Sequence, residues 1–230
     1  MTILFLVVDS TKKYDHPNSF FITNFKAIAQ PNQIACGPTC ISMVLERYKV
    51  RNDLNHVINL TKTKWFSFKG EPFGLTIPDY MIVSMNTLGV KAKQRNGNLD
   101  RLKHFISQNK PVIVLVRGGF KTWHYLVVIG YDKETVTIAD PYEGEIKVMS
   151  SADFVGCWNF TSDINGRKMV KDCNICKGTG KWINPIFGPF SICDVCGGSG
   201  KQIDYMNLLL RSADIYNQTM IVPDESLSQL

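Results

Sequence analysis

The stretch Gln30-Pro31-Asn32-Gln33-Ile34-Ala35-Cys36-Gly37-Pro38-Thr39-Cys40 sets a cysteine where a polar segment gives way to a helical pattern. Proline suits the first turn of a helix, because its missing N–H would have no partner there. Apolar side chains then follow the spacing of a buried helical stripe: Ile41, Val44, Leu45 and Tyr48. We therefore expect a helix that begins near Gly37-Pro38, with Cys36 at its N-terminal end.

This position favours thiol chemistry at Cys36. The positive end of the helix dipole and the free backbone N–H groups stabilise an anion there, and the thiolate is the nucleophilic form of cysteine. The same N–H groups could hold a developing oxyanion. Cys40 falls on the inward stripe of the helix, so we expect it to pack in the core, and Cys157 has no partner pattern and is expected to be structural.

A thiolate nucleophile needs a base, and the sequence offers four histidines, His16, His56, His104 and His124. His124 opens a strand-like run, Tyr125 to Ile129, and a side chain at the mouth of a strand can face a helix N-terminus across a cleft. An imidazole also needs an acceptor that orients it, and Asp140 ends the next strand-like run. Gln30 could donate a side-chain N–H to an oxyanion, although Gln33 is close by.

The periodicity around these residues predicts an α+β fold. One helical pattern covers 79–88 and stops at Gly89. A second begins after Asn98, which acts as its N-cap. Strand-like runs follow in sequence at 112–116, 125–129, 135–139 and 145–149. Helices followed by sequential antiparallel strands are typical of α+β domains.

Four motifs in this order resemble the papain-like cysteine peptidases of the C39 and C39-like families. The motifs are Gln30, Cys36-Gly37-Pro38-Thr39, His124 to Asp132, and Asp140-Pro141-Tyr142-Glu143-Gly144, and the resemblance extends to Pro111 to Val114 and to Phe154 and Trp158. It implies a papain-like fold, an N-terminal helical part plus an antiparallel sheet. It also implies Cys36 as nucleophile, His124 as general base and acid, Asp140 as its orienting partner and Gln30 as oxyanion donor. The reaction would then cleave a peptide or isopeptide bond through a thioester.

Two rival functions stay open on the sequence. The same thiol could carry out deamidation or transfer an acyl group to an amine, because these reactions differ only in which nucleophile reaches the thioester. Alternatively, the C39-like domain could be catalytically inert and serve as a protein-binding adapter. The chain has no nucleotide-binding loop, since Gly200-Lys201 has Val195 five positions earlier and Gln202 after it. We therefore do not expect this chain to act on the double-glycine substrates of transporter-linked C39 peptidases.

A repeat of eight residues distinguishes the C-terminal part of the chain. Cys173-Asn174-Ile175-Cys176-Lys177-Gly178-Thr179-Gly180 recurs as Cys193-Asp194-Val195-Cys196-Gly197-Gly198-Ser199-Gly200. Four thiolates in two C-x-x-C pairs, Cys173, Cys176, Cys193 and Cys196, suffice for one tetrahedral structural Zn²⁺. The repeat resembles the C-x-x-C-x-G-x-G zinc-binding region of DnaJ-type chaperones. The apolar spacer from Trp182 to Phe190 could hold a protein substrate or pack internally.

The expected organisation has five segments: an N-terminal strand and loop at 1–24, the peptidase-like domain at 25–160, a linker at 161–170, the zinc module at 171–204 and a C-terminal segment at 205–230. Hydrophobic residues make up 44% of the 230 residues and charged residues 20%, as in soluble globular proteins. No apolar run is long enough to span a membrane, and no signal peptide is apparent. We therefore expect a cytoplasmic enzyme.

The net charge of +6 could favour an acidic partner. However, lysine and arginine are scattered along the chain without a run of five. Basicity without clustering is weak support for nucleic-acid binding. The expected partner is therefore a peptide or protein substrate.

Overall fold

The structure of the chain is a computed structural model that describes residues 13–68, 71–117, 123–159, 170–172, 177, 179, 181–184, 188–192, 201–203 and 218–224. The chain divides into two compact units. The first comprises Met1–Phe160 together with Asn217–Leu230, and the second comprises Thr161–Tyr216. Among the described residues, no helix has the length and apolar character needed to cross a membrane.

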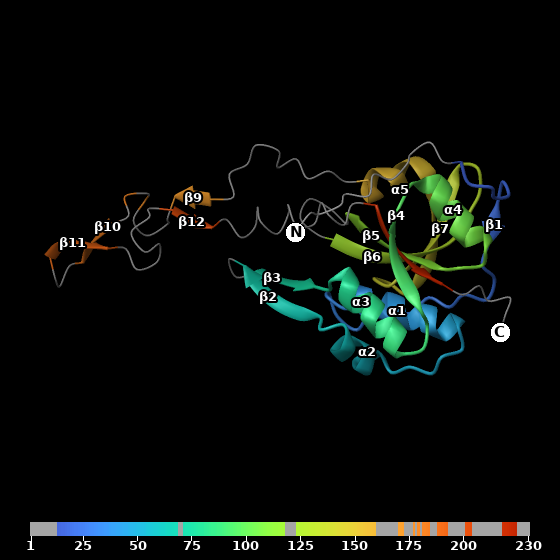
Figure 1. The fold of residues 1–230 in the computed structure, drawn as a ribbon, viewed down its shortest axis with the longest axis horizontal. Coiled ribbons are helices and arrows are strands. Elements are labelled where there is room, and N and C mark those ends of the chain that lie inside the picture. Colours follow the sequence, from blue (N-terminus) through green and yellow to red (C-terminus); the bar gives the residue numbers. More distant parts are fainter. Residues whose placement is uncertain are drawn as a thin grey trace, which may run out of the picture. The chain divides into compact units, whose positions relative to one another are not determined.

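A seven-stranded sheet forms the centre of the first unit, with the strand order β4-β13-β5-β6-β7-β8 and β1 beside β6 (Figure 1). The strands are β1 (Phe20–Phe21), β4 (Ala92–Asn96), β5 (Val112–Arg117), β6 (Trp123–Tyr131), β7 (Thr135–Asp140), β8 (Glu145–Ser150) and β13 (Thr219–Pro223). All their pairings are antiparallel. The strand-like runs from 112 to 149 are thereby confirmed as four consecutive strands.

Helices cover both faces of this sheet. The helices α1 (Cys36–Arg47), α2 (Leu54–Leu60) and α3 (Pro78–Thr87) gather on one side, and α4 (Leu99–Ser107) and α5 (Ser151–Trp158) lie on the other (Figure 1). Helix α1 packs on β6 from its side, and α4 packs on β6 from the opposite one. Burial on both faces explains why Tyr125 to Tyr131 are all buried and why this strand is almost continuously apolar.

The helix boundaries follow local signals in the sequence. Asn98 caps α4 by accepting a hydrogen bond from the backbone N–H of Arg101, as predicted. Helix α3 ends just before Gly89, whose φ of +95° lies in the left-handed region that glycine adopts readily. Asp53 and Ser150 cap α2 and α5 in the same way as Asn98.

Strand β13 corrects the expected boundaries. Residues 205–230 were expected to form a separate C-terminal segment, but Thr219–Pro223 is a fully buried strand between β4 and β5 of the first unit. The indole Nε1 of Trp158, at the end of α5, donates to the carbonyl oxygen of Thr219 over 3.4 Å. The second unit is therefore an insertion in the peptidase-like domain and not a C-terminal appendage.

The N-terminal segment also differs from its expected role as a separate strand and loop. Residues 1–12, with the predicted strand Ile3 to Val8, lie outside the described residues. Phe20–Phe21 pairs with Gly130 and Tyr131 of β6, and Ile22 is fully buried. This segment therefore belongs to the sheet and core of the first unit.

Two further antiparallel pairs are described in the second unit: β9 (Val170–Asp172) with β12 (Lys201–Ile203), and β10 (Lys181–Asn184) with β11 (Gly188–Ile192). The pairing of β10 with β11 makes a hairpin of the apolar spacer. A third hairpin, β2 (Lys64–Phe68) with β3 (Glu71–Leu75), belongs to the first unit. The four zinc-ligand candidates and most of the expected linker at 161–170 lie outside the described residues.

Candidate active site

Cys36 is the first residue of α1, and its side chain is largely buried, with 9% of the residue exposed. The predicted start of this helix, near Gly37-Pro38, is confirmed to within a residue. No side chain caps the N-terminus of this helix, and no acidic residue lies in its first turn. The positive end of the helix dipole is therefore not neutralised by its own sequence, which favours a negative charge on the Cys36 sulfur.

His124 and Asp140 approach from neighbouring strands of the sheet. His124 is the second residue of β6 and Asp140 is the last residue of β7. The imidazole Nε2 of His124 lies 2.7 Å from Oδ1 of Asp140. Their side chains are 20% and 16% exposed, so the pair is shielded from most of the solvent.

The electrostatics around His124 favour its protonated form. Burial lowers the pKa of His124, but hydrogen bonds to Asp140 and Cys36 and the negative charges of these groups outweigh it and raise the pKa from 6.5 to about 9. His124 therefore interacts with both Asp140 and Cys36, and the three residues form one cluster. Because Nε2 binds Asp140, the other ring nitrogen, Nδ1, is left to face the thiol.

The tight turn after β7 holds Asp140. Its Oδ1 also accepts the backbone N–H of Tyr142 over 2.9 Å. Burial raises the pKa of Asp140, but the hydrogen bonds from His124 and Tyr142 and the charges of His124 and Lys147 lower it below the ordinary value. Asp140 is therefore ionised at neutral pH and can stabilise a protonated His124.

Gln30 lies against the same turn. Its backbone N–H donates to the carbonyl oxygen of Pro141 over 2.7 Å, and Gly144 packs against Ala29, so closely that a Cβ at Gly144 would lie 2.6 Å from the Ala29 nitrogen. The Gln30 side-chain Nε2 donates to the carbonyl oxygen of Asn32 over 2.8 Å. An amide NH₂ has two hydrogens, so one stays available for another acceptor.

Cys40 differs from Cys36 although it lies one turn further along α1. Cys40 is fully buried. Burial, together with the negative charges of Cys36 and Asp140, raises the pKa of the Cys40 thiol well above its ordinary value. The thiol therefore stays protonated, in agreement with the packing role expected for it.

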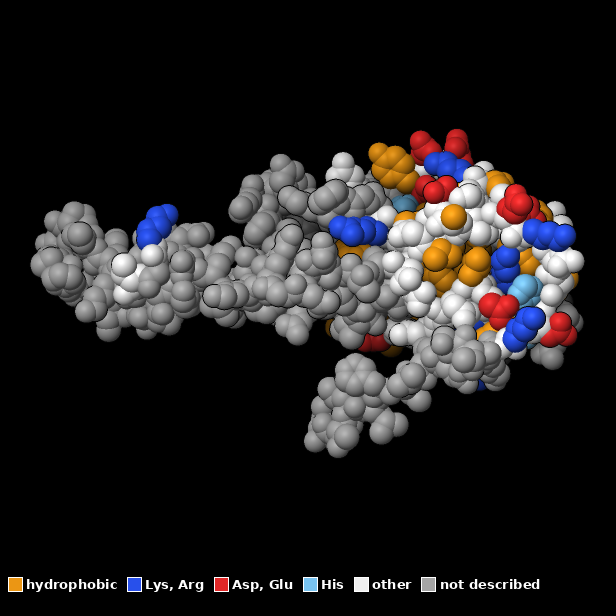
Figure 2. Space-filling view, turned by 90° about the horizontal axis from the view of Figure 1, so that it is seen from above, with side chains coloured by type: hydrophobic (Ala, Val, Ile, Leu, Met, Phe, Trp, Pro, Cys, Tyr) orange, Lys and Arg blue, Asp and Glu red, His pale blue; other side chains and the backbone are white. Residues whose placement is uncertain are grey.

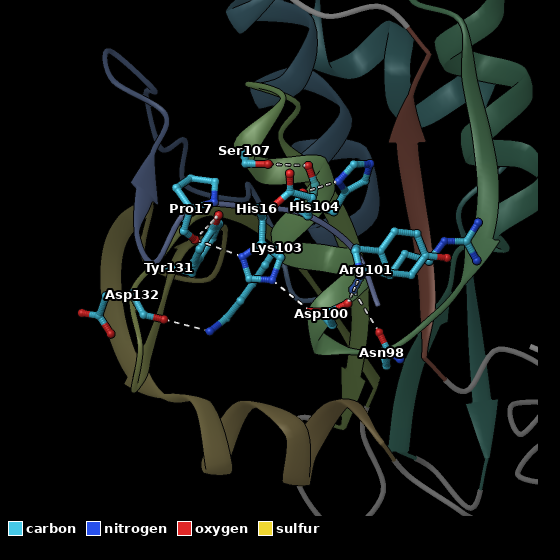
Figure 3. A network of polar contacts seen from close by, with 12 residues as sticks. His16, Pro17, Asn98, Asp100, Arg101, Lys103, His104, Ser107, Tyr131 and Asp132 are labelled. Carbon is cyan, nitrogen blue, oxygen red and sulfur yellow. Dashed lines mark hydrogen bonds and ion pairs between the residues drawn. The ribbon is translucent and has the colours of Figure 1, made fainter. Parts of the chain in front are cut away.

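A second histidine–aspartate pair lies elsewhere in the first unit (Figure 3). His16 Nε2 lies 3.0 Å from Asp100 Oδ1, and His16 Nδ1 lies 3.0 Å from the carbonyl oxygen of Pro17. Both ring nitrogens are thus occupied by oxygen partners, and neither is left for a nucleophile. The pair, with the bond from Tyr131 Oη to Pro17, joins the N-terminal segment to α4 and β6.

Sequence reasoning missed Lys147, which contacts Asp140, and gave Gly144 no role beyond its place in the motif that begins at Asp140. Lys147 Nζ lies 3.5 Å from Asp140 Oδ2, and Gly144 has a φ of +71°. The short Asp140 to Glu145 connection contained a usable signal. A tight hairpin sets Asp140 opposite Glu145, and a long side chain two residues further, at Lys147, can then reach back diagonally.

No metal site is evident among the described residues, where no group of three or more His, Cys, Asp or Glu side chains could hold an ion. On the face of the molecule that Figure 2 draws, acidic and basic side chains of the described residues are interspersed. This mixture agrees with the scattered lysines and arginines of the sequence.

Comparisons with known proteins identify relatives of the first unit. The model of the Peptidase_C39 like family matches residues 22–165. An uncharacterized protein of Methanothermobacter thermautotrophicus is 29% identical over 121 residues, which is 53% of this chain and 75% of that protein.

Two solved structures are also similar to this chain. A protein of Bacillus anthracis described as a C39-like peptidase superimposes with a TM-score of 0.52 and 18% identity, over 62% of this chain and 92% of that chain. The peptidase domain of Streptococcus ComA, a bifunctional ABC transporter, has a TM-score of 0.47 and 22% identity, over 59% of this chain and 93% of its own. The Bacillus anthracis structure confirms the expected α+β, papain-like fold of the first unit.

Proposed function

Because the chain belongs to the Peptidase_C39 like family and is a peptidase-like enzyme, we propose that it cleaves a peptide or isopeptide bond with Cys36, His124 and Asp140 as its catalytic residues. The observation that carries this proposal is the position of His124, which hydrogen-bonds to Asp140 over 2.7 Å and whose pKa is raised by both Asp140 and the neighbouring Cys36 thiol. An imidazole held between a carboxylate and a thiol is the arrangement that thiol hydrolysis requires.

The resting site holds a thiolate and an imidazolium in this proposal. His124, with a pKa of about 9, is protonated at neutral pH, and its positive charge and the N-terminus of α1 stabilise the negative sulfur of Cys36. The sulfur attacks the carbonyl carbon of the substrate, and the carbonyl electrons move onto its oxygen. His124 then gives its proton to the leaving amine as the C–N bond breaks and a thioester forms.

Water resolves the thioester. Neutral His124 takes a proton from the attacking water, and the C–S bond breaks. The products are a carboxylic acid, which releases its proton to solvent, and the restored thiolate–imidazolium pair. Asp140 keeps Nε2 of the ring occupied throughout, which leaves Nδ1 free to move protons between sulfur, amine and water.

The oxyanion of both steps needs hydrogen-bond donors. The backbone N–H of Cys36 at the uncapped start of α1 is one candidate, and the second hydrogen of the Gln30 amide is the other. The hydrogen bond from the Gln30 N–H to Pro141 and the packing of Gly144 against Ala29 hold the amide beside the turn that carries Asp140.

Selective alkylation tests the proposal without a known substrate. With iodoacetamide at pH 6, where free cysteine is almost all thiol, Cys36 should react about tenfold faster than free cysteine, or faster still. His124→Ala should bring the rate down to that of an ordinary thiol, and Cys40→Ala serves as the matched control and should not. A wild-type Cys36 that reacts no faster than free cysteine would instead support an inert, adapter-like domain.

A second experiment separates the possible reactions of the thioester. Proteins from a cell lysate are incubated with the wild-type enzyme or with Cys36→Ala, and their peptides are compared by mass spectrometry. New chain termini that depend on Cys36 support hydrolysis. A gain of +1 Da at glutamine or asparagine would show deamidation, and new amide cross-links would show acyl transfer.

We also propose that the second unit holds one structural Zn²⁺ through Cys173, Cys176, Cys193 and Cys196. The support is the strand pairing that brackets the two repeats. Residues 173–180 connect β9 to β10, and residues 193–200 connect β11 to β12. Because β9 pairs with β12 and β10 pairs with β11, the residues that flank the two repeats are paired, Asp172 with Lys201 and Lys181 with Ile192.

The donor chemistry suits zinc, because four thiolates in two pairs satisfy a closed tetrahedral site. Such an ion stabilises a small unit and takes no part in the thiol reaction. The purified chain should contain one zinc per molecule by elemental analysis. Cys173→Ser and Cys193→Ser should lose it, whereas Cys157→Ser, the control, should keep it. A wild-type chain without zinc would contradict this site.

A further inference from the structure

The second carboxylate oxygen of Asp140 has a partner of its own. Oδ1 is occupied by His124 Nε2 at 2.7 Å and by the Tyr142 N–H at 2.9 Å. Oδ2 lies 3.5 Å from the ammonium nitrogen of Lys147. The carboxylate is thus held from two sides. The His124 imidazole and the turn hold Oδ1, and Lys147 holds Oδ2.

The register of the β7–β8 hairpin explains why Lys147 reaches this oxygen. Asp140 pairs with Glu145 and Ile138 pairs with Lys147, so Lys147 is the diagonal neighbour of Asp140 on the same face of the sheet. A diagonal separation is within the reach of a long side chain. The same ammonium forms a close ion pair with Glu143, in the turn.

We propose that Lys147 is a positioning residue of the active site: its ammonium holds Oδ2 of Asp140 so that Oδ1 stays directed at His124, and its positive charge keeps the carboxylate ionised. This inference rests on the proposed function. It is supported by the solvent exposure of the pair, since the Asp140 side chain is 16% exposed and that of Lys147 is 37%. A largely shielded carboxylate responds more strongly to a neighbouring charge than an exposed one.

Several other titratable groups surround Asp140 and share its field. They are His124 on β6, Glu143 in the turn, and the thiols of Cys36 and Cys40 on α1. The positive charge of Lys147 lowers the pKa of Asp140, in the same direction as the hydrogen bonds from His124 and Tyr142. Loss of Lys147 should therefore make Asp140 protonate at a higher pH.

The rate of Cys36 alkylation, measured from pH 3 to pH 8, tests the role of Lys147. In Lys147→Met the pH at which the alkylation rate falls to half, on the acid side of the profile, should rise by about half a pH unit. This is the size expected of a partly exposed ion pair. Lys147→Arg should restore the wild-type profile. Lys93→Met is the matched control, because Lys93 pairs with Asp224 over 2.9 Å at the opposite end of the sheet order, and it should shift nothing.

Glu143→Gln separates the two partners of Lys147. If Lys147 acts through Asp140, Glu143→Gln should leave this half-rate pH unchanged or lower it, because the Lys147 ammonium then pairs with Asp140 alone. A profile in Lys147→Met that matches the wild type would overturn the inference, and so would a Glu143→Gln that reproduces the Lys147→Met shift. A wild-type Cys36 without raised reactivity would overturn the proposed function instead.

Discussion

His124 Nε2 and Asp140 Oδ1 lie 2.7 Å apart, although 16 residues separate them in the chain. The antiparallel pairing of β6 with β7 brings the start of one strand to the end of the next. The same sheet presents His124 to α1, whose first residue is Cys36. The candidate site therefore depends on the packing of α1 against β6 more than on any local conformation.

The protonation of His124 offers a direct spectroscopic test. The C2–H signal of His124 in NMR should titrate with a midpoint of about 9. In Cys36→Ala the midpoint should fall, because one hydrogen bond and one negative charge are lost. An unchanged His124 midpoint in Cys36→Ala would contradict the contact with the thiol.

The raised pKa of His124 also predicts how stability depends on pH. The pKa is higher in the folded protein, about 9, than the ordinary value of 6.5. The stabilisation is therefore fully present below pH 6.5 and is lost as the pH rises through 9. Its upper limit is about 3 kcal/mol. Urea unfolding at pH 6, 7.5 and 9 should show this decline, and His124→Gln should flatten it.

Gln30 should affect turnover but not the reactivity of the thiol. Gln30→Ala should lower kcat by about 100-fold, because one oxyanion donor is removed. Alkylation of Cys36 should stay within about twofold of the wild type, since no oxyanion forms in that reaction. A parallel loss of both activities would mean that Gln30 supports the fold and not the transition state.

Gly144 should be intolerant of any side chain. In Gly144→Ala the new Cβ would lie 2.6 Å from the Ala29 nitrogen, at a φ of +71° that alanine rarely adopts. The free energy of unfolding should fall by about 2 kcal/mol, and alkylation of Cys36 should slow as the turn with Asp140 shifts. Gly156→Ala is the control: it lies in α5 with no atom within 4 Å of its new Cβ, and should be neutral or slightly stabilising.

Strand β13 predicts which deletions the peptidase-like domain tolerates. A chain that ends at residue 160 loses Met220, Ile221 and Val222, which are at most 4% exposed. Their burial stabilises the fold by about 6 kcal/mol, as much as many domains have in total, so this chain should not fold. Circular dichroism and thermal melting provide the measurement.

A matched deletion isolates the inserted unit from the strand. When residues 161–216 are replaced by a glycine–serine linker of about eight residues, β13 is retained. The Trp158–Thr219 hydrogen bond shows that the end of α5 and the start of β13, which flank the insertion, lie close together. This chain should fold and keep a reactive Cys36. Failure of both deletions would show that the second unit is itself needed for folding.

The sequence predicted the elements whose signals are local. Proline after Cys36, the cap at Asn98 and the glycine at 89 each act through neighbouring backbone groups, and the corresponding helices are present. The strands of β5 to β8 follow one another through short connections, so their antiparallel order was also predictable.

Strand β13 could not be predicted in the same way. Its partners, Ala92–Asn96 and Ile113–Val114, lie more than a hundred residues earlier in the chain. Its five residues contain no local feature that selects these strands over others. The pairing depends on the sheet already being formed, and it places the cysteine-rich unit inside the domain instead of after it.

For the candidate site, the sequence by itself proposed Cys36, His124, Asp140 and Gln30, because each stands in a motif with a chemical reason for its residue type. Only the tertiary structure decided that the imidazole meets both the carboxylate and the thiol, that Gly144 and Ala29 press the Gln30 segment against the turn, and that Lys147 holds the far oxygen of Asp140. The physical reason is range: caps, turns and strand periodicity act over a few residues, whereas these contacts depend on strand register and on the packing of a helix against a sheet.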